Sequence, residues 1–140
     1  MNKYFSLSAV VIVGIAIWLV LPMSKQEVST SGSGDPIVAV KLPQSFSAPA
    51  ELGREKFEAN CAACHGTNAV GKDGIGPPLV HVIYEPNHHG DESFQLAAAQ
   101  GVRQHHWSFG NMPAVQGITR DEVSAIITYV RELQRANGIN

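Results

Sequence analysis

Cys61-Ala-Ala-Cys64-His65 is the most specific motif in this chain of 140 residues, and it contains both of the chain's cysteines. The two thiols are three positions apart, and a histidine directly follows the second. At the end of a helix this spacing points both thiols to the same side, so both can form thioethers with the vinyl groups of one porphyrin. The adjacent imidazole of His65 then reaches the iron. The motif predicts one covalently bound haem c, attached through Cys61 and Cys64.

Three other interpretations of this motif are weaker. A zinc site needs two more ligands, and no second C-x-x-C or H-x₃-H follows at a suitable distance. A thioredoxin-like motif would follow a strand and open a helix, whereas this one closes a predicted helix. A disulfide between Cys61 and Cys64 leaves His65 without a role. Haem attachment is therefore the favoured prediction.

A six-coordinate haem needs a second axial ligand, and Met112 is the candidate. Met1 and Met23 lie in the N-terminal segment, which leaves Met112 as the methionine of the predicted domain. Pro113 disfavours helical geometry at Met112, so the loop is extended and can direct the thioether inward. A thioether opposite an imidazole raises the reduction potential. The alternative is a core methionine that fills a packing gap.

Two helices are predicted around the motif and after it. The first covers Pro49–Ala63, with Ser47 as its N-cap and a proline in the first turn, where proline is tolerated. The second covers Asp91–Gln100, capped by Asp91 and ended by Gly101. Loops rich in glycine, proline, asparagine and histidine separate the helices. Loops of this length in a compact domain need something that organises them.

The clearest helix is the third, which begins at a capping box formed by Thr119 and Glu122. Gly138 is a plausible stop after it. An apolar stripe recurs with helical periodicity along it, formed by Val123, Ile126, Ile127, Val130 and Leu133. No alternating run indicates a strand. The sequence therefore predicts an all-α domain with three main helices.

The N-terminal part divides into two segments. The run from 5 to 21 is uncharged and mostly apolar. As a helix it would span roughly 25 Å, close to a hydrocarbon core of about 30 Å. Residues 1–22 are therefore predicted to be a membrane anchor, with a cleaved signal peptide as the alternative. Residues 23–46 have the composition of a flexible linker. The short apolar run 37–40 in its last part could add a strand or pack on the domain, and an extended connector is the favoured prediction. Residues 47–140 remain for the folded domain.

The chain resembles the class I c-type cytochromes from Gly53 to about Gln134. The resemblance rests on Gly53-Arg-Glu-Lys-Phe57, Cys61 to His65, Gly76-Pro-Pro-Leu79, Met112-Pro113 and the last helix with Tyr129. It implies the small all-α fold of that family around a covalent haem. It also implies that the first and last helices cross at Gly53, Phe57 and Tyr129, and that the carbonyl of Pro77 accepts the Nδ1 proton of His65.

The expected function is one-electron transfer on a haem with His/Met ligation. The net charge of −2 and the scattered cations argue against nucleic-acid binding. No Ser/His/Asp set or paired carboxylates indicate an enzyme. Redox partners are expected in the membrane or the periplasm, with the protein anchored once in a bacterial inner membrane and its haem domain in the periplasm. A haem subunit of a larger membrane oxidoreductase is the main alternative, and a haem-based sensor is a weaker one.

The segment between the two predicted iron ligands is unusually rich in histidine: His81, His88, His89, His105 and His106. The favoured interpretation is a solvated loop surface or one facing the haem propionates. A second metal site formed by His88, His89 and Asp91 is an alternative, although these residues have no recognisable ligand spacing.

The loop before Met112 offers further candidates for contact with haem. His105 or His106 could displace Met112 and give bis-histidine iron. Arg103 and Trp107 are candidates for hydrogen bonds to the propionates, although packing or surface exposure explains these two residues equally well.

Overall fold

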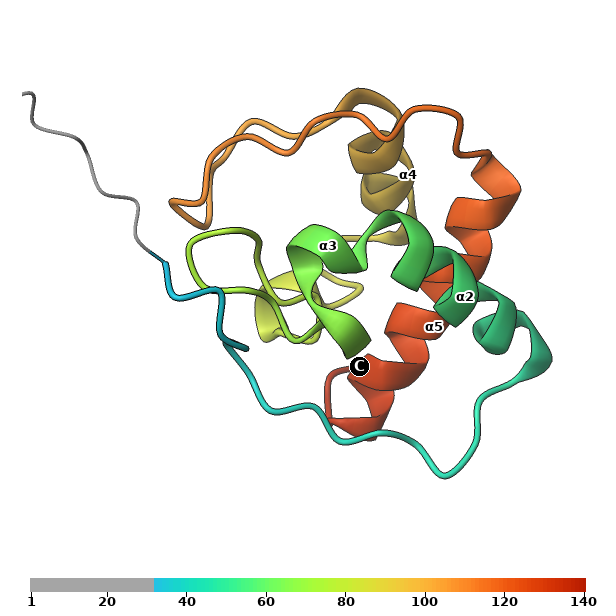
Figure 1. The fold of residues 1–140 in the computed structure, drawn as a ribbon. Helices are drawn as coiled ribbons and strands as arrows, with labels where there is room; N and C mark the ends of the chain where they lie inside the picture. Colours follow the sequence, from blue (N-terminus) through green and yellow to red (C-terminus); the bar gives the residue numbers. More distant parts are fainter. Residues whose placement is uncertain (1–31) are drawn as a thin grey trace, which may run out of the picture.

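The computed structural model describes residues 32–140, and its regular structure is helical (Figure 1). Within that range there is no strand, only isolated bridges between Lys72 and Gly76 and between Val102 and Met112. The elements in chain order are α2 (Ala48–Asn60), α3 (Ala62–His65), the 3₁₀ turns η1 (Thr67–Ala69) and η2 (Val82–Tyr84), α4 (Asp91–Gln100) and α5 (Arg120–Ala136). The predicted all-α class is confirmed.

The core forms where α2 crosses α5, as the resemblance implied. At Gly53 an added Cβ would overlap the backbone carbonyl of Ala125, so only glycine permits this approach of the two helices. The rings of Phe57 and Tyr129 meet at this crossing, 5.6 Å apart between centroids, and both side chains are fully buried. Val130 and Leu133 are buried in the same cluster.

The predicted ends of the first two helices need correction. Ser47 does cap α2, since its side chain accepts from the Ala50 N–H. However, α2 ends at Asn60 because the backbone at Cys61 leaves helical geometry (φ −121°), and the chain resumes as the short α3. The N-cap of α4 is Gly90, not Asp91. Asp91 is the first helical residue, and its carboxylate pairs with Arg131 instead.

Helix α5 agrees closely with its prediction. The capping box is complete: the Thr119 hydroxyl accepts from the Glu122 N–H, and the Glu122 carboxylate accepts from the Thr119 N–H. Gly138 has φ +77° just beyond the helix end, where a left-handed residue commonly ends a helix. All five residues of the predicted apolar stripe are buried.

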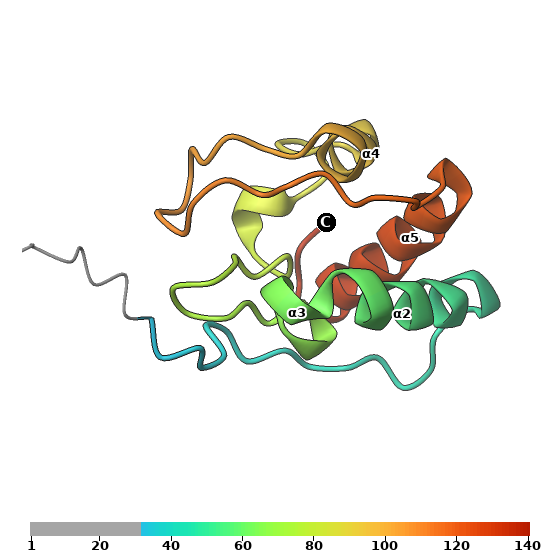
Figure 2. The ribbon, with the colours of Figure 1, turned by 45° about the horizontal axis from the view of Figure 1, so that its top comes forward.

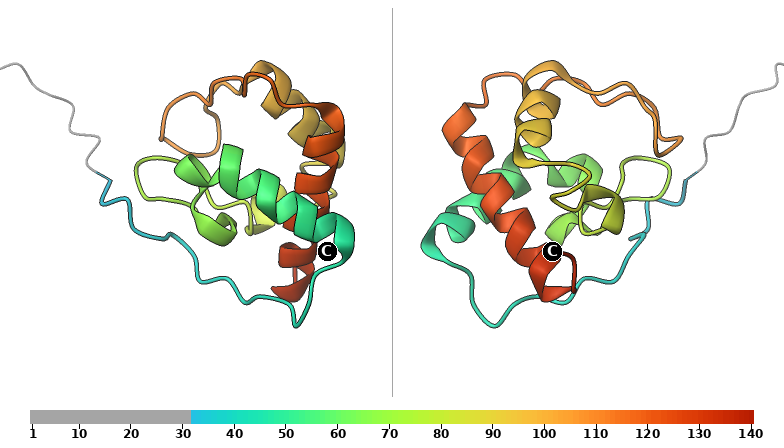
Figure 3. Two further views of the ribbon diagram at one scale, coloured as in Figure 1. Left: turned by 45° about the vertical axis from the view of Figure 1, so that its right-hand side comes forward. Right: turned by 180° about the vertical axis from the view of Figure 1, so that it is seen from behind.

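Residues 32–46 are extended, as favoured from the sequence, and they also pack on the domain, which was the alternative (Figure 3). The N–H groups of Ile37 and Val38 both donate to the carbonyl of Val70. Further along, Lys41 exchanges two hydrogen bonds with the side chain of Asn137. Phe46 then packs on Tyr129 with ring centroids 5.2 Å apart. Apolar side chains on this segment explain the attachment, because they gain burial at the edge of the core.

The domain has two layers (Figure 2). One contains α2, α3 and much of α5. The other contains α4 and the long excursion of residues 101–118, which leaves the end of α4 and returns to the start of α5. Among residues 32–140 no helix is long and apolar enough to cross a membrane. The predicted anchor, residues 1–22, lies outside the described residues.

Candidate haem-binding site

A largely apolar cavity of about 380 Å³ lies between the two layers. Residues after α2 form its wall, from the haem motif, the loop before α4, α4, the 101–118 excursion and α5; examples are Cys61, Leu79, Phe94, Ala98, Val115 and Ile126. Its volume falls within the roughly 300–1,000 Å³ typical of ligand and cofactor pockets. The cavity contains the predicted iron ligands His65 and Met112, which the sequence separates widely.

His65 is buried at the end of α3, and its ring orientation is set by one hydrogen bond. Its Nδ1 lies 2.9 Å from the carbonyl oxygen of Pro77, the contact that the resemblance implied. When Nδ1 donates to this carbonyl, Nε2 keeps a free lone pair for a metal. Burial lowers the pKa of His65, and the bond to Pro77 opposes this shift in part. The imidazole is therefore held in its neutral, ligating form.

The loop that carries Pro77 approaches the haem motif closely. A Cβ added at Gly76 would lie only 2.5 Å from the carbonyl oxygen of Cys64, so a side chain there would force this loop away from α3. Gly76 is therefore needed for steric reasons, because it lets this loop pack against the haem motif. It allows the Pro77 carbonyl to reach the ring of His65.

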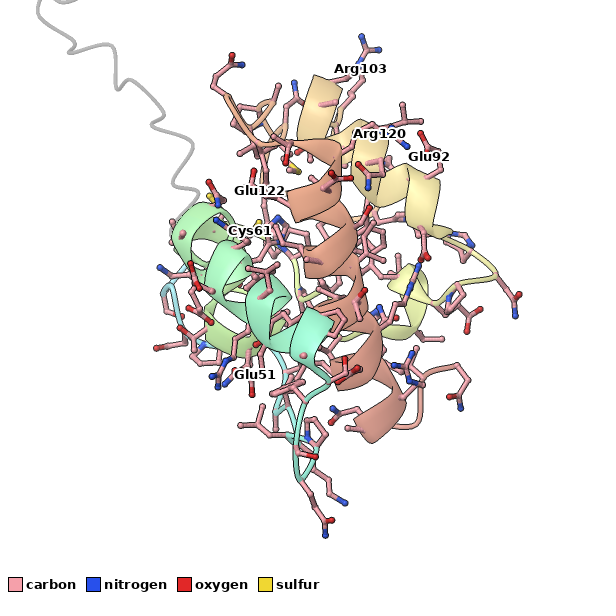
Figure 4. All side chains as sticks on the ribbon, turned by 90° about the vertical axis from the view of Figure 1, so that its right-hand side faces the viewer. Glu51, Cys61, Glu92, Arg103, Arg120 and Glu122 are labelled. Carbon is pink, nitrogen blue, oxygen red and sulfur yellow. The ribbon has the colours of Figure 1, made fainter. Side chains whose placement is uncertain are left out.

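The two cysteines differ in their surroundings. Cys61 lines the cavity at the end of α2, where Figure 4 labels it. Burial, together with the nearby Cys64 and Glu58, raises the pKa of Cys61 to about 11. Cys64 is exposed and lies outside the lining. Both thiols are free, so the structure has no disulfide between them.

Met112 is held in place by its backbone. It exchanges two 2.9 Å hydrogen bonds with Val102 across the excursion, which makes it extended as Pro113 predicted. Gly101, at φ +75°, lies against the Met112 carbonyl so closely that an added Cβ would overlap it. The side chain is half-buried and contributes to the cavity wall.

Trp107 provides a test of whether the cavity fits a haem. Its indole Nε1 is buried and completes no hydrogen bond among residues 32–140, although the Tyr84 side chain lies near it. An incomplete hydrogen bond is unusual for a buried donor. Because the side chain lines the cavity, a haem propionate would satisfy this donor. Arg103, the other propionate candidate, is exposed, lies outside the lining and projects from the edge of the molecule (Figure 4). The residues of the cavity fit a haem, with Trp107 as the polar contact.

The histidines between the ligands separate into two environments. His81 accepts from the Ile83 N–H and packs edge-on against Trp107. The remaining four lie together: His89, His105 and His106 line one rim of the cavity, and His88 packs on them from outside it. Desolvation and the three neighbouring imidazoles lower the pKa of His106. The sequence showed that these histidines are dense but not which of them meet, because the two pairs come from different loops.

Comparison with known proteins agrees with the fold and the cavity. Residues 50–134 match the family described as Cytochrome c. This match covers more than half of the chain, and the chain belongs to the cytochrome c family. With the attachment motif, membership makes it a haem c electron carrier, with one haem bound covalently through Cys61 and Cys64.

One curated protein illustrates the similarity. The cbb3-type cytochrome c oxidase subunit CcoP of Azospirillum brasilense is 41% identical over 49 residues. The match covers 31% of this chain and 17% of that subunit, so the chain corresponds to a small part of this relative's length. The comparison with solved structures found no match.

Proposed function

We propose that His65 and Met112 are the two axial ligands of the haem iron and that the protein carries single electrons between partners at a membrane. The observation that carries the proposal is that both side chains line one apolar cavity at the attachment motif. A haem bound there supplies a one-electron Fe(II)/Fe(III) couple.

The chain's own residues keep this site suited to electron transfer. The Pro77 carbonyl orients the His65 ring and increases its basicity. The pairing of Met112 with Val102 fixes the backbone that presents the thioether. The apolar wall excludes water from the space between the ligands. With His65 and Met112 both bound to the iron, no iron position would remain for a substrate, so we propose a carrier and not an enzyme.

We also propose where the protein is located in the cell. Residues 1–22 would anchor the protein once in a bacterial inner membrane, with residues 47–140 in the periplasm. A tether raises the local concentration of a domain near partners in the same membrane. The redox partners would therefore be membrane-bound or periplasmic proteins.

A second candidate is a haem subunit of a larger membrane oxidoreductase. The similarity to the oxidase subunit CcoP supports it. Both candidates use the same haem site, so purification decides between them. Extraction of the full chain in mild detergent would recover a stable multisubunit complex if the protein is a subunit. A free carrier would elute alone, and a protein found in the soluble fraction would contradict the anchor.

Replacement of Met112 tests the ligand set. We expect Met112→Ala to lose the weak long-wavelength band of the Fe–S bond in the oxidised protein and to bind CO readily when reduced. Its reduction potential should fall, within the roughly 0.8 V range that axial ligands control. Visible spectra and a potentiometric titration of the haem-loaded protein measure these changes.

Met112→His is the matched variant for this experiment. It should restore six-coordination and resist CO, but with the lower potential of a bis-histidine haem. If Met112→Ala keeps the wild-type spectrum, another residue is the ligand. Ready CO binding by the wild type would contradict the carrier and favour a sensor.

A further inference from the structure

Four imidazoles meet at the rim of the cavity, and we call His88, His89, His105 and His106 the histidine cluster. Two come from the loop before α4 and two from the 101–118 excursion. The ring centroids of His88 and His106 are 5.3 Å apart, and those of His89 and His106 are 5.2 Å apart. Four like groups that gain charge on protonation are costly to hold together unless they stay neutral or share a cation.

Three members of the cluster have the geometry of a metal site. Ring nitrogens of His88, His89 and His106 all lie within 4.8 Å of one another. The Nε2 atoms of His88 and His106 are 3.4 Å apart. Two imidazoles bound to tetrahedral Zn²⁺, at about 2.0–2.1 Å per bond, place their nitrogens about 3.3–3.4 Å apart. This pair is therefore at ligand spacing already.

His89 is also oriented as a ligand would be. Its Nδ1 lies 2.6 Å from the carbonyl oxygen of Ile83. Donation to a backbone carbonyl fixes the tautomer and leaves Nε2 with its lone pair, which is the usual arrangement for a metal-binding histidine. The backbone at this residue is fixed too, because Arg131 donates from Nη2 to the His89 carbonyl at 2.6 Å.

The structure changes the ligand set that the sequence suggested. Asp91 is engaged by Arg131, whose Nε donates to its Oδ1 at 2.9 Å. His106, which is distant in the sequence, stands with His88 and His89 in its place. A set of three imidazoles without a carboxylate favours nitrogen-preferring ions such as Zn²⁺ over Mg²⁺ or Ca²⁺.

We propose that His88, His89 and His106 bind one first-row divalent ion such as Zn²⁺, with water completing the coordination. His88 and His106 are exposed, so the ion enters from solvent. A bound ion links the loop before α4 to the excursion that carries Met112. Because all three ligands are neutral, the ion keeps its double charge beside the cavity. This charge disfavours Fe(III), so binding raises the reduction potential of the haem.

Zinc titration of the haem-loaded full chain, treated first with chelator, tests the site. We expect one Zn²⁺ per chain by calorimetry, with a Kd of about 10 μM or tighter, and no comparable binding of Mg²⁺. His88→Gln and His106→Gln should each weaken Zn²⁺ binding at least about tenfold. His105→Gln is the matched control: its ring packs on His106 and lines the cavity but is not in the ligand set, so this variant should keep saturable Zn²⁺ binding and lose less affinity than His88→Gln.

The haem provides an independent readout and a check on folding. Zn²⁺ should raise the potential of the wild type but not that of His88→Gln, while the visible spectrum of His88→Gln stays that of the wild type. His88 lies outside the cavity wall, so its replacement leaves the haem surroundings intact. The proposal is overturned by absence of saturable zinc binding, by equal loss in His105→Gln, or by a changed iron ligand spectrum in His106→Gln.

Discussion

At Gly53 the backbone of α2 lies directly on that of α5, and no side chain fits between them. An added Cβ would overlap the carbonyl of Ala125, which belongs to a helix backbone and cannot rotate away. We therefore expect Gly53→Ala to separate the helices and to lower the free energy of unfolding by about 3 kcal/mol. A guanidinium chloride titration of the haem-loaded protein, followed by circular dichroism, measures this loss.

Gly90→Ala is the matched control for the substitution at Gly53. Its backbone has an ordinary negative φ of −63°, and an added Cβ would meet only the Pro86 carbonyl at 3.7 Å. The lower chain entropy of alanine in the unfolded state opposes its weakness as an N-cap, so the change should stay within about 1 kcal/mol. Equal losses in both variants would show that the close helix approach is not the cause.

Among the elements, α5 does more than complete the core, because Arg131 ties it to the loop before α4. Its guanidinium is buried and donates to the carbonyls of Tyr84 and His89, at 2.7 and 2.6 Å, as well as to Asp91. Lysine keeps the charge but lacks the fork that reaches both carbonyls. We expect Arg131→Lys to lower the free energy of unfolding by about 2 kcal/mol, measured by denaturant titration.

The variant Asp91→Asn removes the ion pair with Arg131 but leaves Arg131's hydrogen bonds to the two backbone carbonyls in place. The Asp91 side chain is 68% exposed, so its pairing with Arg131 is screened by solvent and its loss should cost less than about 1 kcal/mol. If Asp91→Asn is as damaging as Arg131→Lys, the ion pair and not the two carbonyl contacts holds the loop.

Elements whose signals are local were predicted well from the sequence. The start of α5 depends on Thr119 and Glu122, which are three residues apart, and its buried stripe depends on helical periodicity. The break in the first helix at Cys61 was missed, because the change of backbone direction has no local signal there. The burial of Arg131 was missed for another reason: its partners, the Tyr84 and His89 carbonyls, are brought to it only by the folded chain.

In the functional site, too, features with a local sequence signal were predicted and features that depend on folding were not. Cys61, Cys64 and His65 are adjacent, so their chemistry is visible in the sequence. Met112 could be paired with His65 from the sequence because a six-coordinate haem needs a second ligand and Met112 is the methionine of the predicted domain. No sequence pattern indicated which members of the histidine cluster would meet. His106 joins His88 and His89 only because the excursion folds back over the loop before α4.

At the scale of the whole molecule, the two layers are held in different ways. The α2–α5 layer has its own buried cluster around Phe57, Tyr129 and Leu133, whereas the excursion faces the cavity that a bound haem would occupy. We expect Cys61→Ser combined with Cys64→Ser, which removes both attachment points, to loosen the excursion selectively. Hydrogen exchange at the amide of Met112 should accelerate at least about tenfold more than at Val130 in the core.

The haem-loaded wild type is the reference for this comparison. In the wild type the Met112 amide is hydrogen-bonded and Val130 is buried. Met112 N–H donates to Val102 across the excursion, so its exchange reports directly on that pairing. Equal acceleration at both positions would mean that the α2–α5 crossing depends on the haem as much as the excursion does. Unchanged exchange at Met112 would mean that the excursion closes over the cavity even when no haem is attached. Selective acceleration instead assigns the haem a structural role, as the body against which the layer carrying Met112 is packed.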